Sequence, residues 1–510
     1  MASAAESSEV LVVGGGPVGM LLAGELRLHG AEVTVLERLP EPSGRSRAFR
    51  LQPRTLELLD ARGLLERFEA DHLRWPKAHF AGVSPLLRLD RLDSAHPYSL
   101  LIPQARTERL LEEWATELGA RILRGHELTG LTQDAERVTA RVAGPDGEYA
   151  FTAGYLVGCD GGRSTVRKAA GIGFPGTGGG VTALLGDVRL EDPAALPVGV
   201  PGTMRTPRGL LMAVALEEGV TRVLTTEFGG AQEQEDGRSR DRDRDAPVTL
   251  EELRAGIRRV TGAEVPVGEA TWLSRFSDAT RLAENYRSGR VLLAGDAAHV
   301  HFPIGAQGLN LGLADAVNLG WKLAAESAGR APEGLLDSYH AERHPVAVRV
   351  LRETRAQLAL MNPDERVDAL REVFSELLAI DEVNLLLSEL TSGLDVVYDL
   401  ADEAGPGSVH PRTGRRAPEL SLRTAEGATV RLAELLRPGR PVLVDPTPAG
   451  KAAAAAAGWA DRVAVVTGEP VDAEAAPALL VRPDGHVAWA ADEGDEGLRA
   501  ALARWFGETW

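Results

Sequence analysis

The chain has 510 residues, of which 44% are apolar, and a formal net charge of −18. The length favours about three domains, and the apolar content is ample for their cores. The acidic balance argues against nucleic acid and against a membrane surface as partners, because both require basic patches on the protein.

Three further features favour a cytoplasmic protein. The segment Met1–Glu9 is small and acidic, without the basic region that opens a secretion signal. No apolar run reaches the roughly 20 residues that a membrane-spanning helix requires. The single cysteine, Cys159, excludes an intramolecular disulfide and fits a reducing compartment. It lies in an apolar run, where we expect it to be inert packing.

The N-terminal segment has the pattern of a dinucleotide-binding strand, turn and helix. An apolar run is followed by three glycines, Gly14, Gly16 and Gly19. The first permits a tight turn, the second lets the backbone approach a pyrophosphate, and the third lets the helix pack on the strand. A second apolar run, Val33–Leu36, ends at Glu37, which follows Gly16 by 21 residues, the spacing expected for a ribose-binding acid. The segment predicts a site for an adenine dinucleotide.

The next part of the chain alternates helical and strand patterns. A helix with an apolar face is predicted from about Pro53 to Phe68, and another over Thr107–Leu118. Asp146-Gly147 predicts a hairpin turn between two of the strands that follow. The predicted strands are Arg121–Arg124, Val138–Val142, Tyr149–Thr152 and the buried run Tyr155–Asp160.

A second glycine-rich motif, Gly158–Arg167, follows the last of these strands. Its acid, Asp160, ends the strand, glycines turn the chain, and Ser164 is placed to cap a helix. Arg163 and Arg167 are either planar cationic donors to a phosphate or part of a solvated helix face.

The pattern of apolar and polar residues changes after this motif. The run Gly171–Gly176 repeats the glycine spacing, but it follows a helical stretch and contains Pro175, so we interpret it as the turn after that helix. Residues 178–280 carry alternating patterns, which predict an antiparallel sheet inserted as a substrate-covering layer. Within them, Gln232–Asp245 lacks apolar residues and alternates in charge, and we interpret it as a solvated, mobile loop.

A third motif occupies Gly295–Asn310. The apolar run Arg290–Ala294 ends at Asp296, and a loop rich in Gly and Pro then opens a helix. His299 and His301 have no third metal ligand nearby, so we expect local hydrogen bonding rather than a metal site.

Helices and a final α/β segment complete the chain. The tripeptide Gly405–Gly407 marks a boundary between the two. The predicted elements are a long helix over Ala314–Ser327, a helical stretch from Leu335 to about Leu400, and strands at Pro441–Asp445, Val463–Val466 and Ala478–Trp489.

Together the three motifs resemble those of the FAD-dependent aromatic hydroxylases, the group A flavoprotein monooxygenases typified by para-hydroxybenzoate hydroxylase. The resemblance covers nearly the whole chain and is closest to the branch that acts on aromatic polyketides. It implies an α/β fold in three parts. These are a Rossmann-type FAD-binding domain with C-terminal helices over 1–177 and 281–400, an antiparallel-sheet substrate-binding domain over 178–280, and a thioredoxin-like domain without redox cysteines over 401–510.

The resemblance also implies cofactor-binding roles for individual residues. The pyrophosphate and its surroundings would be bound by Gly14, Gly16, Gly19, Arg47 and Gln104, and the adenosine by Glu37, Arg38 and Leu128. The ribityl chain would be bound by Asp296 and the ring by Pro303, Gly308, Leu309 and Asn310, while Asp160 belongs to a motif linked to both FAD and NAD(P)H. A plainer alternative is that the two aspartates only cap turns. No catalytic acid or base is assigned, because the flavin carries the chemistry.

The implied activity is hydroxylation of an aromatic polyketide. FAD is held tightly without a covalent bond, NADPH (or NADH) binds transiently to reduce it, and O₂ adds at flavin carbon C4a to give the hydroperoxide that oxygenates the ring. Alternatives on the same fold are Baeyer–Villiger oxygenation of a ketone, inactivation of an antibiotic, and a non-catalytic polyketide-binding flavoprotein. A plain NAD-dependent dehydrogenase is a further alternative, and both a monomer and a homodimer are open.

Overall fold

The computed structural model describes residues 6–190, 192, 196–197, 202–217, 219–228, 247–400, 410–447, 449–471 and 476–509. The predicted loop Gln232–Asp245 and the predicted boundary Gly405–Gly407 lie outside these residues. The fold is mixed α/β, as predicted. Within the described ranges, no helix is long and apolar enough to cross a membrane.

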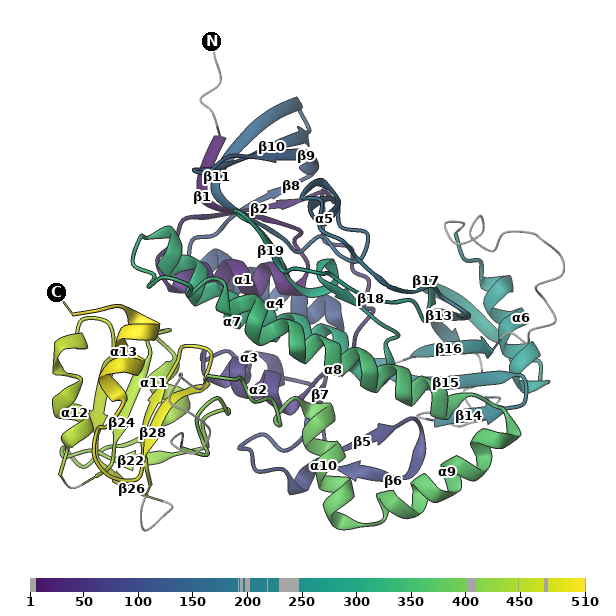
Figure 1. Ribbon diagram of the computed structural model, residues 1–510. Helices are drawn as coiled ribbons and strands as arrows, with labels where there is room; N and C mark the ends of the chain where they lie inside the picture. The colour runs from purple at the N-terminus through teal and green to yellow at the C-terminus, as the bar shows by residue number, and fades with distance from the viewer. Residues whose placement is uncertain are drawn as a thin grey trace.

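The largest sheet, called the central sheet below, is mostly parallel and lies in the upper part of the view in Figure 1. Its order is β19-β20-β11-β1-β2-β8, with the β9–β10 hairpin attached to β11. Its strands are β1 (Glu6–Val13), β2 (Val33–Glu37), β8 (Arg121–Arg124), β9 (Glu127–Gln133), β10 (Val138–Gly144), β11 (Gly147–Gly158), β19 (Arg287–Ser288) and β20 (Val291–Leu293). Gly158 is in register with Val13 on one side and Leu293 on the other, and all three strands are parallel. The loops after β1, β11 and β20 therefore leave the sheet at one edge.

Helix α1 (Pro17–Leu28) packs between α4 (Gln104–Glu117) and the long helix α7 (Gln307–Ser327). Glycines permit this close packing. A Cβ atom on Gly24 would lie 2.2 Å from the Trp114 ring of α4, and one on Gly320 of α7 would lie 2.5 Å from the Glu25 side chain. Helix α1 is thus nearly enclosed, which fixes where its first turn points.

The predicted helix over Pro53–Phe68 is wrong as a single element. The structure has two helices, α2 (Pro53–Asp60) and α3 (Leu65–Glu69). Between them, Gly63 adopts a left-handed φ of 68°, and the N–H of Leu64 donates back to the last turn of α2. This is the glycine-dependent way in which many helices end.

The predicted strands Tyr149–Thr152 and Tyr155–Asp160 are parts of one strand, β11. The hairpin before it is confirmed, but its turn is Pro145-Asp146, one residue earlier than predicted, because Gly147 already pairs with Gly144.

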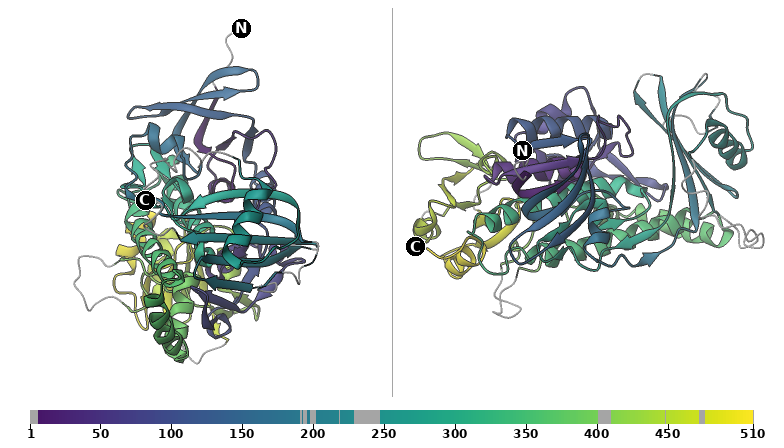
Figure 2. Two further views of the ribbon diagram at one scale, coloured as in Figure 1. Left: turned by 90° about the vertical axis from the view of Figure 1, so that its right-hand side faces the viewer. Right: turned by 90° about the horizontal axis from the view of Figure 1, so that it is seen from above.

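A second, antiparallel sheet stands apart from the central one, in the order β14-β15-β16-β13-β17 (Figure 2). Its strands are β13 (Val181–Leu190), β14 (Gly202–Thr206), β15 (Gly209–Glu217), β16 (Val220–Phe228) and β17 (Val267–Ser277). Helix α6 (Leu250–Thr261), which was not predicted, buries Leu253, Ile257 and Val260 against one face. The sequence explains where α6 begins and ends. Thr249 caps its first turn, and Gly262 ends the helix with a left-handed φ of 76°.

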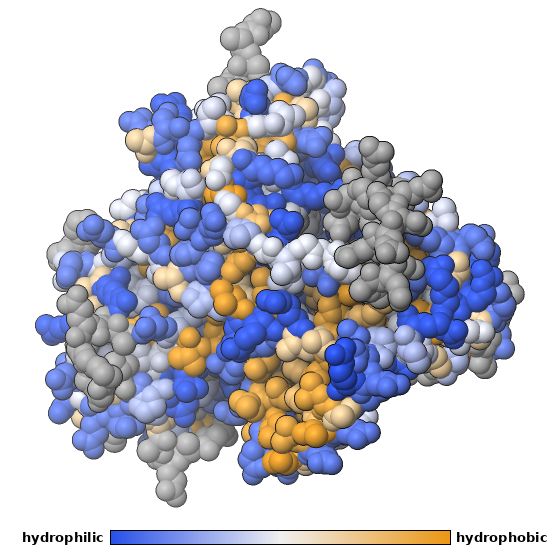
Figure 3. Space-filling model, turned by 45° about the vertical axis from the view of Figure 1, so that its right-hand side comes forward, coloured by the Kyte–Doolittle hydropathy of each residue, from blue (hydrophilic) through white to orange (hydrophobic). Residues whose placement is uncertain are grey.

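The predicted helical stretch from Leu335 to about Leu400 contains three helices and ends earlier. They are α8 (Ser338–Met361), α9 (Glu365–Leu378) and α10 (Asp381–Ser392). A hairpin that was not predicted, β5 (Lys77–Phe80) with β6 (Val83–Arg88), packs on α9 and α10, and the rings of Phe80 and Phe374 lie 5.3 Å apart. Figure 3 shows apolar side chains gathered on the lower part of one face, and the exposed large apolar residues of this region are Leu86, Leu370, Val373, Leu377, Ile380 and Leu386.

The C-terminal part holds a sheet in the order β25-β24-β27-β28. The strands are β24 (Val442–Asp445), β25 (Ala464–Thr467), β27 (Ala478–Val481) and β28 (Val487–Ala491), with helices α12 (Lys451–Ala455) and α13 (Leu498–Phe506). The predicted strand Ala478–Trp489 is therefore two antiparallel strands. Trp321 of α7 packs against the rings of Trp505 and Phe506 at 6.4 and 6.2 Å, which joins this part to the helices beside the central sheet.

A buried ion network crosses the same contact. Arg482, in the turn after β27, donates at 2.7 Å to both carboxylate oxygens of Glu342 on α8 and also contacts Asp484. Lys322 of α7 lies 2.8 Å from Glu342. These charges are almost fully buried, so each depends on its partner.

Replacing Arg482 with Met should destabilise the protein by about 3–5 kcal/mol, because two buried carboxylates lose their main counter-charge. Urea unfolding followed by tryptophan fluorescence measures the change. Arg366→Met, which removes an exposed ion pair with Asp364, is the control and should change little. A loss in R482M no larger than in the control would contradict the assigned role.

Candidate cofactor site

The first loop, after β1, is built on two glycines that cannot carry a side chain and one that faces open space. A Cβ atom on Gly14, whose φ is 110°, would lie 2.3 Å from the carbonyl oxygen of Cys159, and one on Gly19 would lie 2.0 Å from that of Gly14. Gly16 has nothing within 4 Å of the same position. Gly14 and Gly19 thus serve contacts within the protein, while Gly16 leaves the backbone accessible to a ligand.

The first turn of α1 offers backbone donors. Gly16 caps the helix without a side-chain hydrogen bond, and Pro17 follows. The carboxylate of Glu37, at the end of β2, accepts from the N–H of Gly15 at 2.7 Å and from that of Leu39 at 2.8 Å. A helix N-terminus left open in this way favours a bound anion such as a phosphate.

The second loop places Asp160 at the start of α5 (Thr165–Ala169). One carboxylate oxygen accepts from the N–H of Thr165 at 2.7 Å and of Val166 at 3.1 Å, so the capping role is observed. The other oxygen is buried and has no partner among the described residues. Ser164 accepts from the N–H of Arg167 at 2.9 Å, which confirms the predicted helix cap. Burial, and next the Asp160 charge, raise the pKa of the half-buried Cys159 thiol, so it stays neutral.

Arg167 behaves differently from either prediction. Its guanidinium is buried, donates to the carbonyl of Ala297 at 2.7 Å and to that of Gly162 at 3.0 Å, and lies 3.7 Å from the Phe174 ring. It is therefore not on a solvated helix face, and its donors hold the second loop to the third. Arg163 is exposed.

The third loop depends on Asp315, a buried residue of α7 that was not predicted. One carboxylate oxygen accepts from His299 Nε2 at 2.7 Å and from the N–H of Gly295 at 3.2 Å. The other accepts from Nε of Arg343, on α8, at 2.8 Å. Burial alone would raise the pKa of Asp315, but the charges of Arg343 and His299 outweigh it and hold the pKa below its usual value. The predicted local hydrogen bonding of the two histidines is confirmed, since His301 Nδ1 lies 2.8 Å from the Phe302 carbonyl.

The loop enters α7 through an unusual backbone. Gly305 and Ala306 both adopt left-handed conformations, with φ of 72° and 55°, and α7 begins at Gln307 without a side-chain cap. A left-handed alanine is strained, and such strain gathers at functional sites. The Asn310 amide holds this turn, because its oxygen accepts from the N–H of Gln52 at 2.8 Å and its nitrogen donates to the Ala306 carbonyl at 2.8 Å.

The segment Ser46–Ala48 is fixed from two sides. Gln104 bonds twice to Ala48, through its backbone N–H at 3.0 Å and its side-chain oxygen at 2.9 Å. Arg222 of β16, paired with Asp187 at 2.8 Å, donates to the carbonyl of Arg47 at 3.0 Å and contacts that of Ser46. The antiparallel sheet thus holds a loop that the prediction places at the pyrophosphate.

The structure brings the three loops together. Gly14 abuts Cys159, a Cβ atom on Gly162 would lie 2.9 Å from Val300, and one on Gly295 would lie 3.0 Å from Val18. The other predicted residues differ in how exposed they are. Arg38, Arg47, Asp296 and Pro303 are exposed, Gly308 and Leu309 are half-buried, and Leu128 is buried in β9. The segment before Leu128 reaches Glu37, whose carbonyl accepts from the N–H of His126 at 3.0 Å.

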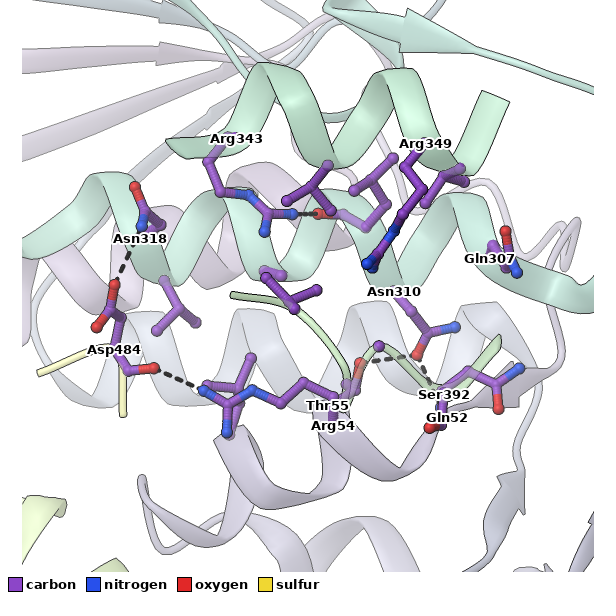
Figure 4. A pocket seen from close by; sticks show the side chains of 18 of the residues that line it. Gln52, Arg54, Thr55, Gln307, Asn310, Asn318, Arg343, Arg349, Ser392 and Asp484 are labelled. Atoms are coloured by element: carbon purple, nitrogen blue, oxygen red, sulfur yellow. Dashed lines mark hydrogen bonds between the residues drawn. The ribbon is translucent and has the colours of Figure 1, made fainter. Parts of the chain in front are cut away.

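Helix α7 packs on α1 through the side that carries Gly312 and Gly320. A separate pocket lies on the opposite side of α7 (Figure 4). Its walls come from α2, α7, α8, the last turn of α10 with the segment after it, and the C-terminal part. Arg349, which points into it, is paired in bidentate fashion with Asp395 at 2.9 Å. Of the predicted cofactor residues, only Asn310 lines this pocket, so the pocket is distinct from the predicted site.

Comparisons with known proteins identify the family of the chain. Residues 7–354 match the family described as FAD binding domain, and residues 410–509 the family described as aromatic-ring hydroxylase, C-terminal. The 12-dehydrotetracycline 5-monooxygenase/anhydrotetracycline 6-monooxygenase of Streptomyces rimosus subsp. rimosus is 46% identical over 98% of this chain and 99% of its own. Rifampicin monooxygenase of Streptomyces venezuelae is 47% identical over 98% of both chains. The solved OxyS anhydrotetracycline hydroxylase from Streptomyces rimosus has a TM-score of 0.91 at 46% identity and covers 99% of this chain and 100% of that chain.

Replacing Gly16 with Ala should preserve folding, because a Cβ atom there meets nothing within 4 Å. It should weaken FAD binding at least tenfold, about 1.4 kcal/mol, since the methyl group would occupy the space beside the first turn of α1. Titration of the apoprotein with FAD, followed by flavin fluorescence, measures the affinity. Gly178→Ala, equally open but distant in the chain, is the control. An unchanged affinity in G16A would place the pyrophosphate elsewhere.

Replacing Asp315 with Asn should weaken FAD binding at least tenfold, because the loop at Gly295 loses the charge that holds His299 and Arg343. Glu342→Gln is a matched control: Glu342 is a buried carboxylate on α8 that pairs with Arg482 and makes no hydrogen bond to this loop. Both variants should lower the melting temperature, but only D315N should lose FAD affinity. Equal FAD affinities in the two variants would show that Asp315 has only a structural role.

Proposed function

The chain belongs to the FAD-dependent aromatic-ring hydroxylases, and from this premise we propose that it hydroxylates an aromatic polyketide with FAD, NADPH and O₂. The observation that carries the proposal is the junction of three loops at the open turn of Gly16. The relatives support the substrate class, since their names describe monooxygenases of tetracycline intermediates and of rifampicin.

The residues at the junction fit FAD. The open N-terminus of α1 suits a pyrophosphate, and Glu37 suits a ribose. The exposed Asp296, which accepts no hydrogen bond from the described residues, suits the ribityl hydroxyls. The uncapped start of α7 has free backbone N–H groups, which would suit the negative charge of a flavin ring bound by Pro303 and Gly308. When bound, FAD supplies the reductive activation of O₂ and the transfer of one oxygen atom to an electron-rich ring.

The second sheet and the third loop share an apolar cluster that suits an aromatic substrate. The face of the sheet opposite α6 contributes Leu210 and Phe276, and the third loop contributes Phe302 and Ile304. The rings of Phe276 and Phe302 lie 5.5 Å apart. An apolar enclosure excludes water from the reacting groups, and this limits wasteful loss of the activated oxygen. We therefore infer that residues 178–280 form the substrate-binding domain.

The C-terminal part supports a proposal of its own. Strand β24 is parallel to β25 and antiparallel to β27, which pairs with β28 before α13. This order, β-α-β-β-β-α, supports a thioredoxin-like domain over 401–510. It contains no cysteine, so its role is structural, in keeping with the ion network and the aromatic contact that join it to α7 and α8.

The proposal predicts incorporation of one oxygen atom from O₂ into a ring carbon. The purified holoenzyme is supplied with NADPH, ¹⁸O₂ and each of anhydrotetracycline, rifampicin and an angucyclinone, and the products are identified by mass spectrometry and NMR. A phenolic product that carries one ¹⁸O is expected. A lactone with the same mass would show Baeyer–Villiger chemistry instead, and binding without NADPH oxidation would show a non-catalytic flavoprotein.

A further inference from the structure

Another cleft lies where the C-terminal part meets the ends of α1 and α7. It encloses about 390 Å³, which is within the range of sites for small organic molecules. Leu28, the last residue of α1, and Trp321, in the second half of α7, both line it. Gly439 of the C-terminal part lines it as well, and a Cβ atom there would lie 2.9 Å from the Leu28 side chain. The cleft is therefore built at the contact between two parts of the fold.

This cleft is remote from the three loops of the candidate cofactor site. Helix α1 runs for 12 residues from Pro17 to Leu28, which is about 18 Å at the usual rise per residue. Helix α7 extends about 27 Å from Gln307 to Ala325, which also lines the cleft. None of the residues predicted to bind the cofactor lines it. A ligand in the cleft would therefore not compete with FAD for space.

Much of the lining of the cleft is apolar and fixed in place. Trp321, Trp505 and Phe506 line it, and each side chain is at most 9% exposed. The Trp321 ring lies 6.4 Å from that of Trp505 and 6.2 Å from that of Phe506. Two buried prolines, Pro441 and Pro483, add to this lining. A lining of this kind favours the apolar body of an organic molecule over water.

The charged lining of the cleft is positive, although the whole chain carries a formal net charge of −18. Three arginines and one aspartate line it, and Arg462 pairs with Asp461 at 3.4 Å, so Arg330 and Arg440 leave a balance of +2. Arg440 donates to the carbonyl of Ala460 at 3.0 Å and has no carboxylate partner among the described residues. In the same part of the chain, no group accepts a hydrogen bond from the Arg330 side chain.

His29 also lines the cleft but does not change this balance. Burial, and next the charges of Arg62 and Arg330, lower the pKa of His29 to about 3, so its ring is neutral at neutral pH.

A planar guanidinium can bind a carboxylate or a phosphate through two parallel hydrogen bonds. A cleft lined by charge of one sign also raises the local concentration of ions of the opposite sign. We propose that this cleft is a second ligand site, which binds an organic anion with an aromatic body and a carboxylate or phosphate group. Arg330 and Arg440 bind the anionic group, and the apolar lining holds the ring. A nucleotide and an aromatic acid share this chemistry, and the experiment separates them. The inference does not depend on the proposed function.

The test measures binding to the oxidised holoenzyme, in which FAD already fills its own site. The probes are 2-naphthoate with its neutral amide, and AMP with adenosine, each titrated by calorimetry. We expect Arg330→Gln/Arg440→Gln to bind at least one of the two anions about tenfold or more weakly than the wild type, because charge-assisted hydrogen bonds are lost. Any binding of the matching neutral probe should stay within about twofold. Asp461→Asn, which releases Arg462 from its partner, should bind the same anion more tightly.

The control variant is Arg137→Gln/Arg366→Gln, which removes the same charge from two exposed positions outside the cleft. It should keep the wild-type affinity for both anions. Arg330 and Arg440 are exposed, so their double variant should keep the wild-type melting temperature. A loss confined to AMP would identify the ligand as a nucleotide, and a loss confined to 2-naphthoate as an aromatic acid. The inference would be overturned by an equal loss in the control variant, by an equal loss for the neutral probe, or by a wild type that binds neither anion at millimolar concentration.

Discussion

The structure depends on one close approach, that of the backbone at Gly14 to the backbone at Cys159. A Cβ atom at Gly14 would lie 2.3 Å from the Cys159 carbonyl oxygen, and one at Gly19 would lie 2.0 Å from that of Gly14. Only glycine satisfies both positions, and the parallel register of β1, β11 and β20 then brings three loops to one edge of the sheet. The open turn at Gly16 lies at this edge, where the proposed function places the ligand.

Buried charge pairs set the positions of those loops. Asp315 and Arg343 hold the loop at Gly295, and Asp187 and Arg222 hold the segment at Arg47. In each case the acid and the arginine satisfy one another, so the loops gain fixed geometry without an unpaired charge.

The sequence predicts the features that depend on local pattern. The glycine turn, the strands that precede Asp160 and Asp296, the Ser164 cap and the mixed α/β class follow from periodicity and turn chemistry. The break between α2 and α3 has a local signal in Gly63, and the ends of α6 have local signals in Thr249 and Gly262. Neither feature was predicted, because these single residues are weak signals beside the pattern of the residues around them. The roles of Arg167 and Asp315 depend on partners that are 130 and 28 residues away in the chain. A local sequence pattern does not link residues that far apart. The assignments of the individual cofactor residues remain predictions.

Hydrogen–deuterium exchange, measured on the apoprotein and after reconstitution with FAD, tests whether the three loops share one ligand. The account predicts that stoichiometric FAD slows exchange together in the segments 14–19, 160–166 and 295–310, with little change in the C-terminal sheet. Protection confined to the segment 14–19 would contradict it, because the second and third loops would then be neighbours of the first without being part of the same site.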